Sequence, residues 1–457
     1  MFFLLRPGYC QAHEWLSSSL RLLAVLLTLS ASNDGRAARG TSAIERWWDG
    51  ANFTENWFGC RQCLEGHGLS LKGGSSAIYQ GITHSNNSQD VSFFCHHFFL
   101  TAKCDFGKML GLEGLTGQAG IQWQTGSGNI NNRSGAGTAF HTASFTGHWK
   151  CNLRSIELTY ATPEIFGIKE FFTISGGWQN PKEHFMLQPH ASLFQNYAFG
   201  GGELAANGVI FKGGYLAWGS YAKLKPTSHC YLQVGVWDAV PVPLHYLKFG
   251  TRCQKFRPNL VLFMGEVGII PELSDAALPL AKYVVGSYYL RQHHRSFFGA
   301  NYPGRCGFYL QADQILYRET HAVTGHALNQ PVGAKRKKTY PQGLYSFGYI
   351  SHSQQSNNSR IPIFLRVGLV YKGLFTTRDE DDLGIAFAHA NYSNFLAHRT
   401  HGRLIQRTNE AVLEISYRFR ANKWLHIQPF LEYLVHPNGD ARSKDSLVLG
   451  IVARMIF

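Results

Sequence analysis

The chain has 457 residues, and its 43 Lys and Arg against 29 Asp and Glu give a formal net charge of +14 at pH 7. Such a balance suits nucleic acid, a membrane surface or an anionic solute, but the basic residues are mostly single and the one run, 335–338, is typical of a solvated loop. No run of 18 or more apolar residues occurs, so the sequence predicts no membrane-spanning helix.

An export signal is predicted for residues 1–32. Arg21 precedes the apolar stretch Leu22–Leu29, and the small residues 30–32 follow as a cleavage region. An exported chain enters an oxidising compartment, where disulfides persist. Eight of the nine cysteines lie beyond this signal: Cys60, Cys63, Cys95, Cys104, Cys151, Cys230, Cys253 and Cys306.

Residues 33–68 are expected to form an N-terminal periplasmic or plug segment with a short helix. Thr54 is placed to cap a helix that reaches Cys63, and Gly66 and Gly68 would end it. Cys60 and Cys63 have the spacing of a redox or metal motif, but no second pair accompanies them, so no metal site is expected. A local disulfide between them and two free thiols are the interpretations left open.

From residue 69 to residue 457 the apolar residues recur with a period of two. Candidate strands lie near residues 69–80, 91–104, 118–124, 138–148, 151–161, 170–178, 208–222, 229–238, 260–270, 282–291, 306–317, 343–351, 362–372, 383–391, 409–419, 425–433 and 446–457. The interpretation is one all-β domain over 69–457, a transmembrane antiparallel β-barrel of about 16 (16–18) strands.

The last strand carries the strongest signal. Leu447, Leu449 and Ile451 alternate on one face, and the chain stops on Phe457. A soluble protein seldom leaves such an edge unpaired, so this strand is expected to close the barrel against the first one. Charged residues recur at mid-strand on the opposite face, as Glu414 and Arg418 do, and this second face is interpreted as a water-filled lumen.

A sugar needs hydrogen-bond partners for its hydroxyls and an aromatic face for its C–H surface. The pore-lining and sugar-contact candidates are Glu157, Gln233, Trp237, Gln311, Asp313, Arg366, Glu414, Arg418, Glu432 and Arg454. Neither a Gly-x-Ser-x-Gly elbow nor a His-Glu-x-x-His motif is present, so no catalysis and no cofactor are expected. The acidic run 379–382 lacks the spacing of a calcium loop and is interpreted as a solvated turn.

Several blocks together resemble the OprB-type carbohydrate-selective porins of Gram-negative outer membranes. They cover roughly residues 47–457 and include 56–68, 265–272, 286–289, 311–318, 368–374, 378–384, 414–417 and 424–429. Phe58 and Cys60 depart from the glycine and leucine usual in the first block.

The resemblance implies an outer-membrane porin through which small carbohydrates diffuse into the periplasm. The expected partners are small saccharides, the lipid bilayer and the barrel assembly machinery, with the protein a monomer or a homotrimer and no nucleic acid bound. Two alternatives stay open. One is a general or anion-selective porin, which the net charge favours, and the other is a disulfide-linked structural or adhesive protein, which the cysteines favour.

Overall fold

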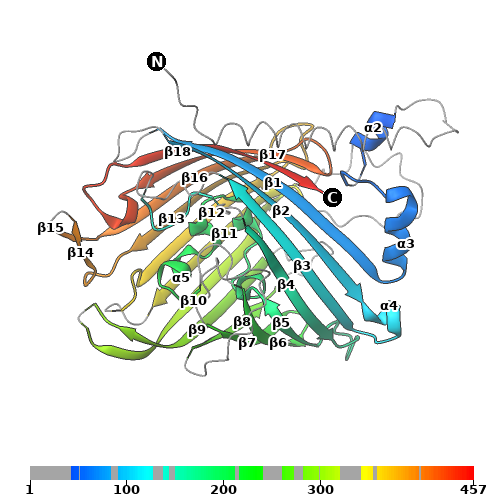
Figure 1. Ribbon diagram of the computed structural model, residues 1–457, viewed down its shortest axis with the longest axis horizontal. Helices are drawn as coiled ribbons and strands as arrows, with labels where there is room; N and C mark the ends of the chain where they lie inside the picture. The colour runs from blue at the N-terminus through cyan, green and yellow to red at the C-terminus, as the bar shows by residue number, and fades with distance from the viewer. Residues whose placement is uncertain are drawn as a thin grey trace, which may run out of the picture.

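Sixteen antiparallel strands close into one barrel (Figure 1). The computed structural model describes residues 43–50, 52–83, 91–126, 137–143, 150–210, 216–239, 260–271, 281–297, 299–319, 341–353, 358–400 and 403–457. The predicted signal 1–32 and Cys253 lie outside these ranges. Strand β1 pairs with both β2 and β18, so the sheet has no free edge.

The barrel strands are β1 Leu69–Ile82, β2 Val91–Asp105, β3 Leu115–Gly126, β4 Lys150–Ala161, β5 Phe172–Gln179, β6 Ala217–Thr227, β7 Cys230–Asp238, β8 Val261–Ile269, β9 Ala281–Arg295, β10 Asn301–Arg318, β11 Gly343–Ser353, β12 Ile363–Lys372, β13 Asp382–Asn391, β16 Asn409–Arg420, β17 Leu425–Val435 and β18 Ser446–Ile456. Strands β14 Ala397–Thr400 and β15 Arg403–Gln406 form a separate hairpin. The helices are α2 Ala43–Trp48, η1 Trp57–Gly59, α3 Cys60–Gly66, α4 Phe106–Leu110, η2 Pro181–Glu183, η3 His190–Leu193, η4 Tyr197–Gly200, α5 Gly202–Ala206 and η7 Pro437–Gly439. None of these helices is long and apolar enough to cross a bilayer.

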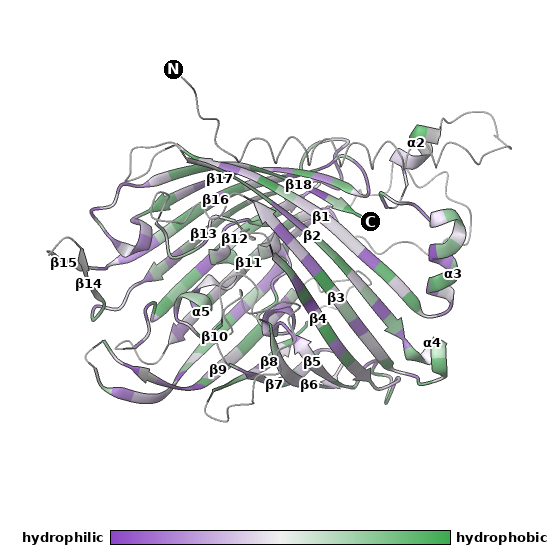
Figure 2. Cartoon of the chain, in the orientation of Figure 1, coloured by the Kyte–Doolittle hydropathy of each residue, from purple (hydrophilic) through white to green (hydrophobic). Residues whose placement is uncertain are grey.

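The predicted alternation of apolar and polar residues corresponds to the outer and inner faces of the barrel wall. It shows as bands of hydropathy along the strands in Figure 2. Ile415, Leu449 and Ile451 are 41–45% exposed on the outer face, where a membrane barrel contacts lipid. Glu414, on the opposite face of the same strand as Ile415, is fully buried inside the barrel. The period of two therefore gave the correct side for these residues.

Two expected strands are wrong in a part that the structure describes. Of the candidate 138–148, residues 138–143 form no strand and fold against the interior, where Gln80 Nε2 donates to Thr142 Oγ1 at 3.1 Å; residues 144–148 lie outside the described residues. In the candidate 208–222, residues 208–210 are not in a strand, residues 211–215 lie outside the described ranges, and strand β6 begins at Ala217. Both stretches contain residues that are buried inside the barrel, such as Phe140 and Ile210, and alternation in the sequence does not separate such packing from a strand.

Barrel closure is reinforced at the end where both chain termini of the barrel lie. Phe457 N donates to Gly73 O and Phe53 N donates to Ile456 O, each at 2.9 Å, so residues before β1 continue the pairing beyond β18. The Phe53 ring meets Phe457 edge-on at 5.6 Å and Trp424 at 5.2 Å. The segment before the first strand thus covers the seam.

The N-terminal segment forms short helices, as expected, but its cap differs. Helix α3 begins after Gly59, which makes no side-chain cap, whereas Thr54 Oγ1 accepts a bond from Arg61 Nη2 at 3.2 Å. The prediction that Thr54 caps the helix is therefore wrong, because residues 57–59 form the separate turn η1 between Thr54 and helix α3. The helix ends at Gly66, and Gly68 has φ +93°, which suits glycine.

One residue of the acidic run 379–382 is not solvated. Asp381, 3% exposed, binds Arg378 through two 2.8 Å bonds and accepts from Tyr417 Oη at 2.5 Å and Arg420 N at 2.9 Å. Burial acts to raise the pKa of the Asp381 carboxyl, but these hydrogen bonds and the charge of Arg378 together lower it. Asp381 thus clamps the β12–β13 turn to the end of β16, which corrects the interpretation of a solvated turn.

Asp381→Asn should lower the free energy of unfolding by about 2 kcal/mol, because charged hydrogen bonds are lost while the shape is kept. The loss is read as an earlier heat-induced mobility shift on gels. Because the folded-state pKa is below the unfolded one, the clamp contributes at neutral pH and its contribution fades as pH falls through the folded pKa. Asp379→Asn, at an exposed position in the same turn, is the control, and equal shifts for both variants would contradict the clamp.

Candidate functional site

Residues 180–210, called the inner segment here, follow β5 and fold into the barrel instead of over its rim. The short helices η2, η3, η4 and α5 belong to it, and α5 is seen inside the ring of strands in Figure 1. Asn180 and Asn196 cap η2 and η4 through their side-chain oxygens. Polar turns joined by short apolar runs let this stretch coil tightly enough to enter the lumen.

Buried carboxylates of the wall hold the inner segment by its backbone. Glu414 accepts bonds from Gln195 N at 2.7 Å and Asn196 N at 2.8 Å. Glu266, on the opposite wall, accepts from Met186 N at 2.6 Å. An unpaired carboxylate is costly to bury, so each of these groups specifies where the segment must lie.

Amide and guanidinium groups of the wall add to this anchorage. Gln233 Nε2 donates to His184 O at 3.0 Å, and Gln311 Nε2 donates to Leu187 O at 2.6 Å. Arg366 Nε donates to the side chain of Gln188 at 3.0 Å. The segment is therefore held from both sides of the barrel.

Aromatic packing fills the space between the inner segment and the wall. The Phe185 ring stands perpendicular to Trp237 at 5.3 Å, and Phe194 lies 5.7 Å from Phe347. All four side chains are at most 4% exposed. This part of the barrel is a packed core, not an open channel.

The inward orientation of the ten predicted site residues agrees with the structure, but most of them do not line open space. Those that pack on or bind the inner segment are Gln233, Trp237, Gln311, Asp313, Arg366, Glu414, Glu432 and Arg454. The prediction that these side chains face a water-filled lumen is wrong for all of them except Arg454, because the inner segment buries the other seven to 5% exposure or less. Their contact with a saccharide stays a prediction.

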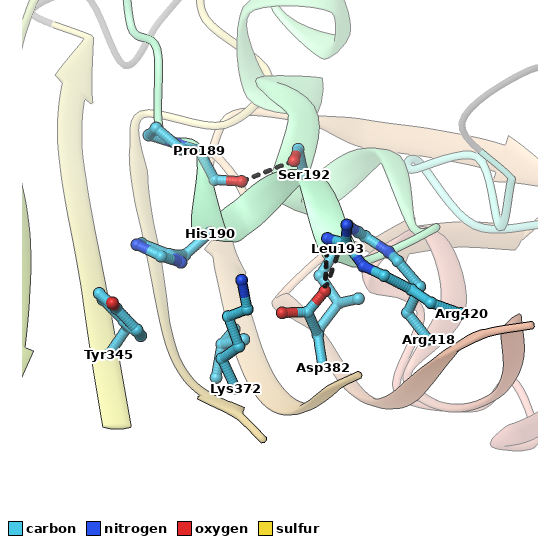
Figure 3. A pocket seen from close by; sticks show the side chains of 10 residues that line it. Pro189, His190, Ser192, Leu193, Tyr345, Lys372, Asp382, Arg418 and Arg420 are labelled. Carbon is cyan, nitrogen blue, oxygen red and sulfur yellow. Dashed lines mark hydrogen bonds and ion pairs between the residues drawn. The ribbon is translucent and has the colours of Figure 1, made fainter. Parts of the chain in front are cut away.

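A cavity of about 190 Å³ lies between η3 and the ends of strands β11 to β16 (Figure 3). It is lined by Pro189, His190, Ser192, Leu193, Tyr345, Val370, Lys372, Asp382, Arg418 and Arg420. These strand ends are joined by the short turns 373–381 and 421–424, and short turns mark the periplasmic end of outer-membrane barrels. We call this cavity the basic pocket.

Ion pairs order the floor of the basic pocket. Arg418 Nη1 lies 3.5 Å and Arg420 Nη2 3.4 Å from the same carboxylate oxygen of Asp382. Lys372 Nζ lies 3.3 Å from Glu380, whose side chain is half exposed. Side chains from four strands and the inner segment thus converge on one polar cavity.

One side of the basic pocket is aromatic. The His190 ring stacks on Tyr345 with centroids 4.3 Å apart and planes 24° apart. Figure 3 shows the two rings on the opposite side of the cavity from Arg418 and Arg420. A flat ring pair facing charged donors is the combination that a saccharide needs.

A second polar cluster lies on the wall made by β2 to β6. His184 Nε2 is 3.7 Å from Glu157 Oε2, and its ring lies 4.2 Å from that of Tyr221. On the same wall the Arg154 guanidinium sits 4.4 Å above the Phe99 ring. Glu157 therefore faces His184 of the inner segment, whereas Arg418 lines the basic pocket.

Sequence reasoning missed His190, Tyr345, Asp382 and Arg420 in the pocket. Arg420 follows Arg418 with the spacing of one face, so its inward direction was available from the pattern. The inner segment left a signal of another kind, since 29 residues separate the candidate strands 170–178 and 208–222. Loops of that length in compact domains are commonly functional.

Known proteins resemble this chain in sequence and in structure. The family model described as "Carbohydrate-selective porin, OprB family" matches residues 95–457. Porin B of Pseudomonas aeruginosa is 22% identical over 480 residues, which cover 96% of this chain and 98% of that protein. The high-pH structure of Pseudomonas putida OprB, 20% identical, superposes with a TM-score of 0.77 and covers 90% of this chain and 99% of its own. The low-pH structure, 17% identical with the same coverage, gives 0.55.

Glu414→Gln should loosen the inner segment by about 2 kcal/mol, because an amide nitrogen replaces one of two charged acceptors. We expect larger and noisier single-channel currents in planar bilayers, since the lumen widens when the segment moves. Glu113→Gln, at an exposed position in the β2–β3 turn, removes one carboxylate without touching the segment. Currents identical in both variants would show that Glu414 does not control the width of the lumen.

Proposed function

The chain belongs to the OprB family of carbohydrate-selective porins, and on that premise we propose the route that a saccharide takes through this outer-membrane porin. The route runs past the Glu157–His184 cluster, along the part of the lumen that the inner segment leaves free, and out through the basic pocket. The observation that carries it is the pocket, where charged donors, one carboxylate and a stacked ring pair face one cavity.

The chemistry of the basic pocket suits polyhydroxylated solutes. Lys372, Arg418 and Arg420 can donate to hydroxyl oxygens, and Asp382 can accept from hydroxyl groups. The His190 ring, which stacks on the buried Tyr345 ring, offers a flat face to the C–H side of a pyranose. Binding at such a site is passive, so transport follows the concentration gradient and involves neither cofactor nor catalysis.

The remaining features of the proposal concern export and assembly. Residues 1–32 act as the export signal, on the strength of Arg21, the apolar stretch 22–29 and the small residues after it. The barrel assembly machinery inserts the chain, which works as a monomer or a homotrimer. The N-terminal segment 33–68 stays on the periplasmic side, where α3 packs beside the start of β1.

A disulfide between Cys60 and Cys63 is the proposed modification of that segment. Both thiols are exposed and unjoined in the structure, and no described strand cysteine stands opposite another in the barrel register. Residues three apart in a helix have Cα atoms about 5 Å apart, from a 1.5 Å rise and a 2.3 Å radius. That separation lies within the range that disulfides bridge. A bond to a neighbouring protein is the alternative, and it would make an anchor of the porin.

Planar-bilayer recording tests the function. The purified porin should give stepwise conductance, and glucose should reduce the current in a concentration-dependent way, because a bound sugar displaces ions from the lumen. Tyr345→Ala should raise the half-blocking concentration by about threefold to tenfold, because it removes the ring on which His190 stacks and an aromatic pair contributes about 0.5–1.5 kcal/mol. Tyr79→Ala, on the outer face, is the matched control. Stepwise conductance that glucose leaves unchanged would favour a general porin instead.

Mass spectrometry after alkylation tests the disulfide. Protein taken from native membranes should carry no alkyl group on Cys60 or Cys63 until it is reduced, and it should run as a monomer on non-reducing gels. A reducible high-molecular-weight band would show the intermolecular anchor. Two thiols alkylated without reduction would refute both forms.

A further inference from the structure

We propose that the basic pocket prefers monosaccharides that carry a carboxylate, such as hexuronates, over neutral sugars of the same size. This inference rests on the proposed function, because it names the class of saccharide that the exit of the pore selects. It is carried by the cationic groups around the cavity and by the aromatic rings on its other side.

The cationic side chains lie in two rows across the strand ends. In the first row, Lys372 of β12 pairs in register with Asp382 of β13, which pairs with Arg418 of β16. In the second, Arg420 of β16 stands opposite His426 of β17, which stands opposite Arg454 of β18. The register of the sheet therefore brings four Lys and Arg residues to one stretch of the inner wall.

The carboxylates near the pocket do not balance these charges. Asp382 is shared by Arg418 and Arg420, at 3.5 and 3.4 Å. Glu380 pairs with Lys372 at 3.3 Å and with Arg420 at 3.8 Å, but its side chain is 51% exposed and is well screened by water. Around the cavity itself, three cationic groups face these two carboxylates, which leaves a positive excess in a partly buried site.

Two donors in the pocket wall have no acceptor. Within the described part of the chain, the Nε–H groups of Arg418 and Arg420 are buried and without a hydrogen-bond partner. A buried donor without an acceptor is unfavourable, and a guanidinium group is best satisfied by a planar carboxylate. The guanidinium groups of Arg418 and Arg420 nevertheless line the cavity with 17% and 30% of their side chains exposed, so an anionic solute there would supply the compensating charge and a planar partner.

The aromatic rings favour a sugar acid over a small inorganic anion. His190 and Tyr345 stack 4.3 Å apart on the side of the cavity opposite the two arginines. A small inorganic anion would satisfy the arginines but not cover these rings, whereas a sugar acid presents a carboxylate at one end and a C–H face at the other. The pocket therefore matches both ends of one solute class.

The test compares glucuronate with glucose, which has the same ring and nearly the same size, as blockers of single-channel current at constant ionic strength. In the natural protein the half-blocking concentration should be about tenfold lower for glucuronate, because charge-assisted hydrogen bonds are about twice as strong as neutral ones. The double variant Arg418→Gln/Arg420→Gln should bring the two sugars within about twofold. Arg442→Gln, which removes one positive charge from the β17–β18 turn at the other end of the barrel, should keep the tenfold ratio.

The outcomes separate this inference from the proposed function. Equal block by both sugars in the natural protein would overturn the carboxylate preference and leave the sugar pore standing. Block by neither sugar would overturn both. A preference that persists in the double variant would remove the basic pocket as its cause. If the double variant fails the gel test of folding, Arg418→Lys/Arg420→Lys keeps the charge but not the planar fork, and it should retain only part of the preference.

Discussion

The interior of this barrel depends on carboxylates that are buried in the wall and satisfied by the backbone of a single segment. Glu266 and Glu414, each at most 2% exposed, face the lumen from opposite sides and accept bonds from Met186 N, Gln195 N and Asn196 N. Removing a carboxylate from water is costly unless it is strongly hydrogen-bonded, so the folded segment and the charged wall require each other. A barrel without the segment would leave these groups to water, and its lumen would be wide.

The packing of the inner segment against the wall decides which parts of the lumen remain open. The inner segment packs its aromatic residues on one side of the lumen, as Phe185 does on Trp237, and leaves polar surfaces at two places. One lies around Glu157 and His184, and the other is the basic pocket at the short-turn end. At both places a histidine of the inner segment, His184 or His190, lies beside polar side chains of the wall.

The opposite constraint acts on the outside, where the sheet must leave no edge in the bilayer. Strands β1 and β18 meet over nine residue pairs, and Phe53 and Phe457 extend the pairing beyond them. The rings of Trp47 and Phe53 pack on Trp424 beside this junction. The segment before the barrel thus contributes to closure of the sheet.

The sequence by itself determined the barrel, because a bilayer imposes the same alternation on every strand and a period of two can be read locally. It placed Ile415 and Leu449 outside and Glu414 inside, and it identified β18 as the closing strand. Only the tertiary structure decided what the inward residues face. Whether Glu414 meets water or a backbone N–H depends on a segment more than 200 residues earlier, and no local pattern encodes that distance. The basic pocket was hidden for the same reason: strand register, set by the closed sheet, brings Lys372, Asp382 and Arg418 into one row.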